Sequence, residues 1–170
     1  EVGSATHLVL QEINLNHTPS YKNINELIQN LIKQKILSKR VAKLIDISSI
    51  MGFYQSKLGK KVLANPKQTY REVPFSLLMS AKDVFEGFEN DNQKILIHGI
   101  IDGYVKTNGG IYLFDYKTDH LTFNTSIKDI LKRYSGQLNL YALALSKIWN
   151  RSVDNKYLYL LSENQTIKVN

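Results

Sequence analysis

Two aspartates and a lysine, carried by neighbouring apolar segments, are the residues whose types and spacing best suit catalysis. The first segment, 94–106, contains Asp102, and the second, 111–118, contains Asp115 and Lys117. Side chains two positions apart on a strand share one face, so Asp115 and Lys117 are expected on the same face. The arrangement predicts a compact group of two carboxylates and one ammonium.

The sequence between the two segments predicts how they pair. The loop Asn108-Gly109 between alternating apolar runs is a strong signal for a two-residue hairpin turn. In that register Thr107 faces Gly110, and counting back along both strands places Asp102 opposite Asp115 on one face. A three-residue loop would instead send the two acids to opposite faces.

Two opposed carboxylates repel each other, so a cation between them is expected. A divalent metal with hard oxygen ligands is the best candidate, and a lysine beside it suits phosphodiester hydrolysis. The alternatives are that Lys117 only neutralises Asp115, or that the acids face water on a surface hairpin. The apolar run 95–101 favours a central strand that is buried on both faces, against the surface hairpin.

Three further side chains are weaker candidates on their own. His7 stands alone among apolar neighbours, which is more typical of a core histidine than of a metal ligand. Gln137 and Tyr141 have an i,i+4 spacing and share a helix face, where both can donate hydrogen bonds to a substrate. Spacing alone favours a packing role for this pair.

Composition limits the class of protein. The 170 residues are expected to form one domain, 1–170, and a net charge of +7 favours polyanionic partners such as nucleic acid. The chain has no cysteine, which excludes disulfides, zinc thiolates and an iron–sulfur cluster within it. No apolar run approaches the roughly 18 residues of a membrane span, so no membrane partner is expected. Because the chain begins with Glu1, it is expected to be cut from a longer protein.

Hydrophobic periodicity predicts a helical N-terminal half followed by a sheet and one long helix. Ser4 is expected to cap the first helix, and a strand over 68–78 is expected to place Tyr70 and Glu72 on one face. The last strand can pair parallel to the second hairpin strand after a helical crossover. The fold class is α/β, with a mixed sheet and a helical addition. Helices are expected at about 4–15, 23–37, 41–45, 50–63 and 126–149, and strands at 68–78, 94–106, 111–118 and 156–161.

Four segments together resemble the RecB-type nucleases of the PD-(D/E)XK superfamily. They are Gly3-Ser4-Ala5-Thr6-His7, Gly99-Ile100-Ile101-Asp102, Asp115-Tyr116-Lys117 and Gln137-Leu138-Asn139-Leu140-Tyr141. They occur in order over nearly the whole chain. The chain is most similar in this respect to the C-terminal nuclease domains of AddA/RexA-type helicase–nuclease subunits, and the resemblance implies a restriction-endonuclease-like sheet with helices on its faces.

The resemblance also implies roles for individual residues. His7, Asp102, Asp115 and the backbone carbonyl of Tyr116 would ligate Mg²⁺, for which Mn²⁺ would substitute, and Lys117 would be the catalytic lysine.

Two more positions are implied by the same resemblance. Gln137 and Tyr141 would form the QxxxY pair that lines the active site near the DNA. Glu72 resembles the family's acidic position on the preceding strand, and its contact with the metal is left open.

The implied function is a Mg²⁺-dependent DNA exonuclease that processes double-strand breaks within an ATP-dependent enzyme. Its partners would be DNA, an upstream helicase domain and an AddB/RexB-type subunit, in the cytoplasm. Two alternatives remain: a non-catalytic DNA-binding module of the same fold, and a stand-alone exonuclease or resolvase.

Overall fold

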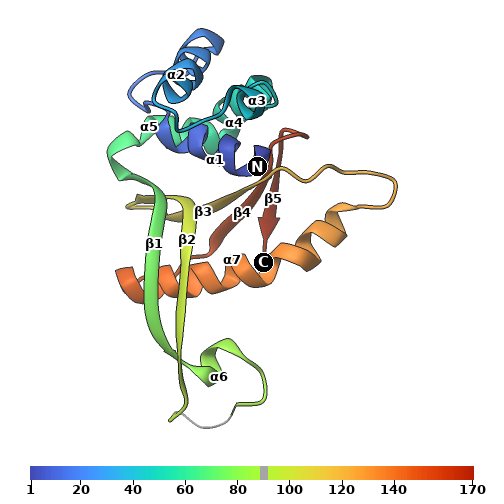
Figure 1. Ribbon diagram of the computed structural model, residues 1–170. Helices are drawn as coiled ribbons and strands as arrows, with labels where there is room; N and C mark the ends of the chain where they lie inside the picture. Colours follow the sequence, from blue (N-terminus) through green and yellow to red (C-terminus); the bar gives the residue numbers. More distant parts are fainter. Residues whose placement is uncertain (89–91) are drawn as a thin grey trace.

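The computed structural model describes residues 1–88 and 92–170, which form one mixed sheet between two unequal helical layers (Figure 1). The sheet has five strands in the order β1-β2-β3-β4-β5, and only β3 and β4 are parallel. This arrangement confirms the predicted α/β class. The strands are β1 Thr69–Ser80, β2 Lys94–Thr107, β3 Gly110–Lys117, β4 Asn155–Leu160 and β5 Gln165–Val169.

Helices of the N-terminal half gather on one side of the sheet, and the long helix α7 (Ile127–Trp149) crosses the other (Figure 1). Each layer buries its own apolar core against the sheet. None of the helices in the described part of the chain is long and apolar enough to cross a membrane. The remaining helices are α1 Val2–Glu12, α2 Tyr21–Lys33, α3 Lys39–Ala42, α4 Ile47–Gln55, α5 Lys57–Ala64, the 3₁₀ helix η1 Pro66–Gln68 and α6 Ala81–Val84.

The hairpin of β2 and β3 has the predicted two-residue turn. Thr107 pairs with Gly110, and the ladder continues to Gly103 opposite Phe114, where it ends. Gly103 is required there, because a Cβ atom at this position would lie 2.3 Å from the Phe114 ring. The register prediction is therefore confirmed, and the two strands part just where Asp102 and Asp115 follow.

The prediction that β2 is buried on both faces is wrong for its first half. Leu96 is 60% exposed and Ile100 is 54% exposed. Up to Asp102, β2 pairs with β1 alone, because the ladder to β3 begins at Gly103. The first half of β2 therefore runs with β1 as a two-stranded ribbon past α7 to α6 (Figure 1).

The predicted shared face of Tyr70 and Glu72 is also wrong. Tyr70 stacks on Tyr104 and approaches Trp149 of α7, whereas Glu72 lies beside His7 of α1, on the other side of the sheet. The cause is a left-handed backbone at Glu72, with φ of 48°. This single residue breaks the alternation of the strand and turns the carboxylate towards α1.

Several element boundaries differ from those expected. Glu1 occupies the N-cap of α1 and Ser4 lies inside that helix. The helix predicted over 50–63 is two helices, because Ser56 is extended and its side chain caps α5 through the Gly59 amide. Strand β5 was not predicted; its alternating burial is short and follows a turn.

Two glycine substitutions test this packing. Gly103→Ala should lower the free energy of unfolding by about 1–3 kcal/mol, because Phe114 cannot move aside within a close-packed core. Gly136→Ala, in α7, is the matched control, since no described atom lies within 4 Å of its added methyl group. It should raise the free energy of unfolding by about 0.5–1 kcal/mol. Urea denaturation measures both, and equal effects would contradict the proposed crowding at Gly103.

Candidate active site

Asp102 lies where β2 and β3 separate, and it joins the sheet to α1. Its Oδ2 accepts a hydrogen bond of 2.8 Å from the Tyr116 amide, and its Oδ1 lies 3.4 Å from His7 Nδ1. The backbone ladder between β2 and β3 ends before Asp102 and Asp115, and beyond it the Tyr116 amide bonds to the side chain of Asp102. This contact fixes one carboxylate oxygen and turns the other towards α1.

Glu72 completes a compact group with His7 and Asp102. One potential ligand atom from each of the three residues lies within 4.8 Å of the others. A cavity of about 260 Å³ opens beside them and is also lined by Ile100. The left-handed backbone at Glu72 brings this carboxylate into the group, which alternation along a regular strand does not predict.

The buried Asp115 forms an ion pair with the half-buried Lys117 next to this group. Asp115 is only 4% exposed, and its Oδ2 lies 2.6 Å from Lys117 Nζ. Burial and the negative charge of Asp102 raise the pKa of Asp115 to about 6, although the Lys117 ammonium lowers it. The charge of Asp102 thus acts on Asp115, although Asp115 lies outside the group of His7, Glu72 and Asp102.

Helix α7 holds the Lys117 ammonium from a second direction. Lys117 Nζ donates to Gln137 Oε1 at 3.3 Å and lies 4.2 Å from the centre of the Tyr134 ring. Gln137 Nε2 in turn donates to the Tyr141 hydroxyl at 3.0 Å. The predicted pair Gln137 and Tyr141 thus reaches the lysine, and the ammonium is held by a carboxylate, an amide oxygen and an aromatic face.

Tyr134 was not among the residues predicted for the site. Its spacing placed it on the inner face of the long helix, which is typical of a core residue. Its hydroxyl donates to the Asp119 carboxylate, which also accepts from Arg133. These contacts fix the Tyr134 ring beneath the Lys117 ammonium. The sequence does not predict them, because they depend on the path of the segment after β3, which carries Asp119.

Arg71 is a second residue that sequence reasoning missed. Its guanidinium donates to the carbonyls of Leu10 and Ile13, both at 2.8 Å, at the C-terminal end of α1. A cation there satisfies carbonyls that have no partner within the helix and complements its dipole. Arg71 therefore holds the end of α1, and the neighbouring Glu72 lies beside His7 of the same helix.

Proton affinity rises at His7, Glu72 and Asp115. Burial lowers the pKa of His7, but the hydrogen bond to Asp102 and the charges of Asp102, Asp115 and Glu72 outweigh it and raise the pKa overall. Burial and the charges of Asp102 and Asp115 raise the pKa of Glu72. Excess negative charge is the common cause, and it favours any bound cation.

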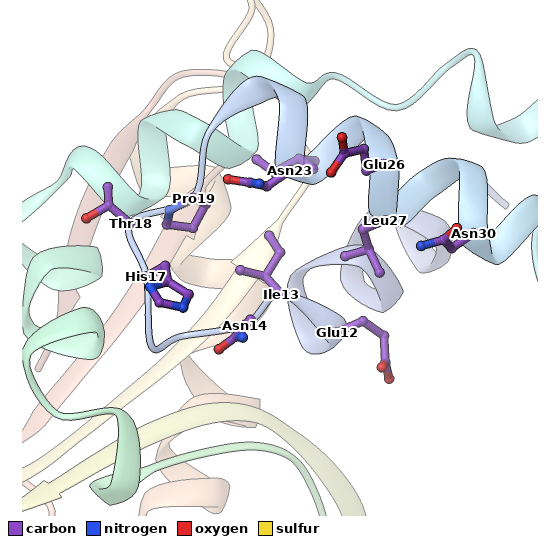
Figure 2. A pocket seen from close by; sticks show the side chains of 11 residues that line it. Glu12, Ile13, Asn14, His17, Thr18, Pro19, Asn23, Glu26, Leu27 and Asn30 are labelled. Atoms are coloured by element: carbon purple, nitrogen blue, oxygen red, sulfur yellow. The ribbon is translucent and has the colours of Figure 1, made fainter.

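The donor set fits a hard divalent metal. Carboxylate oxygens suit Mg²⁺ and Mn²⁺ and form most of the set, whereas the single imidazole is a ligand more typical of transition metals. A larger groove of about 350 Å³ between α1 and α2 does not offer such a set. Its lining includes His17, Glu12 and Glu26 beside asparagines and apolar side chains (Figure 2), but among the described residues these three do not form a group with closely spaced ligand atoms.

Comparison with known proteins identifies the family of the chain. The model of the PD-(D/E)XK nuclease superfamily matches residues 1–169. The chain belongs to the PD-(D/E)XK nuclease superfamily. The resemblance noted in the four sequence segments is therefore confirmed, and the mixed sheet is that of this nuclease fold.

Curated relatives of this nuclease domain are named as the A subunits of ATP-dependent helicase/nucleases. The Levilactobacillus brevis protein is 44% identical over 99% of the chain, and the Lactiplantibacillus plantarum protein is 45% identical over 100%. The Enterococcus faecalis protein is 37% identical over 95% of the chain. The chain spans only 13–14% of the length of these relatives.

The raised pKa of Asp115 predicts how stability of the metal-free nuclease domain depends on pH. The folded carboxyl has a pKa of about 6 and the unfolded one 3.8, so the folded state binds more protons between these values. The free energy of unfolding should therefore fall as the pH rises from about 4 to about 6. The raised pKa of His7 acts in the same direction at higher pH. Urea denaturation in excess chelator measures this slope.

Two variants serve as controls for that slope. Asp115→Asn should flatten it, whatever the variant's absolute stability. Asp46→Asn should leave the slope between about pH 4 and about 6 nearly unchanged, because the hydrogen bond from the Ser49 hydroxyl lowers the pKa of Asp46, so that its contribution falls below this window and has the opposite sign. An unchanged slope in Asp115→Asn would show that the charge of Asp115 does not destabilise the metal-free fold.

Proposed function

We propose that this chain is the metal-dependent deoxyribonuclease domain of an ATP-dependent helicase–nuclease subunit. It would hydrolyse phosphodiester bonds of DNA during the processing of double-strand breaks. The observation that carries the proposal is the meeting of His7, Glu72 and Asp102 with the ion pair of Asp115 and Lys117. Similarity along the whole chain to the A subunits of helicase/nucleases supports it.

The residues that would hold the metal are His7, Asp102, Asp115 and the Tyr116 carbonyl, with Glu72 at hand as a further oxygen donor. Mg²⁺ is the proposed ion, and Mn²⁺ would substitute. Bound there, the ion would polarise a phosphate and lower the pKa of a water molecule. The excess negative charge of the metal-free site supports this assignment.

The chain's own groups would supply the remaining chemistry. The Lys117 ammonium can hold a water molecule for attack on phosphorus and stabilise the negative charge that develops on the phosphate oxygens. The water would form a new P–O bond and give up a proton, the P–O bond to the leaving sugar oxygen would break, and that oxygen would take up a proton, so that no proton is gained or lost overall. Gln137 and Tyr141 keep the ammonium in place and can donate hydrogen bonds to the DNA strand.

The two alternative functions have less support. A non-catalytic DNA-binding module would not need a lysine–aspartate pair beside a three-residue ligand group. A stand-alone nuclease is not favoured by relatives in which the matched region is 13–14% of the length. The helicase, the AddB/RexB-type partner protein and the cytoplasmic location are part of the proposal.

Asp102→Asn tests the proposed function. Asparagine keeps the shape and one oxygen but removes the charge that would hold the cation, so cleavage of DNA should fall by about 100-fold or more. Asp154→Asn is the matched control, because Asp154 is an exposed acid bonded to Ser152. Its activity should equal that of the wild type. The melting temperature of metal-free Asp102→Asn should stay level or rise.

The same assay tests the metal. Mg²⁺ or Mn²⁺ should support cleavage, and Ca²⁺ should support binding better than cutting. Cleavage at the normal rate in excess chelator would refute the metal-dependent mechanism, and wild-type activity in Asp102→Asn would refute the role of this residue.

Tyr134 should act as a positioning residue for Lys117. Tyr134→Leu removes the ring under the ammonium and should lower kcat by about 3- to 30-fold, as expected for a cation–π contact of about 0.5–2 kcal/mol. Tyr134→Phe keeps the ring and should retain near-normal kcat. Steady-state kinetics and Mn²⁺ titration measure the effect, and Mn²⁺ affinity should stay unchanged in both variants. A Phe variant as slow as the Leu variant would assign the effect to the hydroxyl and Asp119 instead.

A further inference from the structure

An apolar face without a covering layer in the described part of the chain extends from the candidate active site along the β1–β2 ribbon. On this face Leu78 lies opposite Leu96, and Pro74 lies opposite Ile100. The side chains of Leu78, Leu96 and Ile100 are 58%, 60% and 54% exposed. We call these three residues the ribbon face.

The opposite side of the same ribbon is packed in the ordinary way. Phe75 meets the ring of Tyr141 from α7 at 5.4 Å, and Met79 is buried. The ribbon is thus apolar on both sides, but the described residues of this domain cover only one of them. On the outward side the two apolar pairs flank the exposed pair of Ser76 and His98, so the surface is mostly apolar with one polar pair at its centre. Several exposed apolar side chains on one face mark interaction surfaces in proteins, whereas single exposed ones do not.

The chemistry of the ribbon face favours protein over DNA as its occupant. Between the Glu72–Asp102 level and the Ser80–Lys94 level, the outward positions carry no lysine, arginine or acid, and their polar side chains are those of Ser76 and His98. A surface for the DNA backbone needs cations, and this chain has an excess of them elsewhere, with a net charge of +7. An aliphatic surface suits an equally apolar protein surface.

The length of the curated relatives indicates which protein surface would cover the ribbon face. They continue for more than four-fifths of their length outside the region that this chain matches. We propose that the ribbon face is a docking surface for the rest of the helicase–nuclease polypeptide. This inference rests on the proposed function, because it takes the chain as one domain of such a polypeptide.

The ribbon face adjoins the cavity of the candidate active site, so docking there would also shape that cavity. Ile100 lines the same cavity as His7, Glu72 and Asp102. A docked apolar element would therefore form a wall of the catalytic cavity. The DNA strand would reach the acids along a passage made by both parts of the polypeptide.

Photocrosslinking in the full-length polypeptide tests the docking. Leu96→p-benzoylphenylalanine places the crosslinker on the ribbon face, and Leu44→p-benzoylphenylalanine is the control, since Leu44 is 61% exposed on the far helical layer. We expect Leu96 to crosslink within the polypeptide, to a segment outside this domain, without DNA. The yield should persist from about 0.05 to about 0.5 M salt, unlike phosphate contacts. Leu44 should give no such product.

Other outcomes would overturn the proposal. These are crosslinking to DNA that is lost at high salt, crosslinking to a second copy or to a separate partner protein, and a yield no higher than that of Leu44. Asp102→Asn, tested in parallel, should lose cleavage and keep the crosslink. Failure of the nuclease assignment is therefore visible separately from failure of the docking.

Discussion

Mutual repulsion among negative charges, one of them buried and two half-buried, is the constraint on which the rest of this structure depends. Glu72, Asp102 and Asp115 gather where two strands part, with Lys117 as the half-buried cation that pairs directly with one of them. The acids raise the proton affinity of their neighbours. The fold must hold these charges together at a cost in stability, which a bound cation would offset.

The scaffold meets this constraint by fixing each group from a different element. The sheet supplies the acids, α1 supplies His7, and α7 supplies the amide and rings around Lys117. Arg71 ties the end of α1 to β1, and a capping box of Ser126 and Asp129 fixes the start of α7. Helices at both sides of the sheet therefore converge on one point, although their residues are far apart in sequence.

Local signals in the sequence were enough for the hairpin, and the fold class followed from the order of elements. The Asn108-Gly109 turn sets the register, and Ser126 begins the long helix where the sequence predicts. The positions of Glu72 and Arg71 could not be derived in this way. They depend on a left-handed backbone at one residue and on the approach of a helix some 60 positions away in sequence. The ribbon shows the same limit, because Leu96 and Ile100 are exposed where no third strand of the described residues continues beside them. The periodicity of apolar residues predicts which side chains favour burial, but it does not predict which element, if any, packs against them.

Tyr116 has a consequence of its own, because one residue connects the aromatic core to the metal-binding region. Its ring packs edge-on against Phe53 and His7, while its amide holds Asp102. Small movements of the core beneath α4 are thereby transmitted to two proposed ligands. Conditional alleles are expected to arise in this core: a loosened Phe53 pocket would let the ligand geometry drift on warming, and cleavage would fail at temperatures where the domain is still folded.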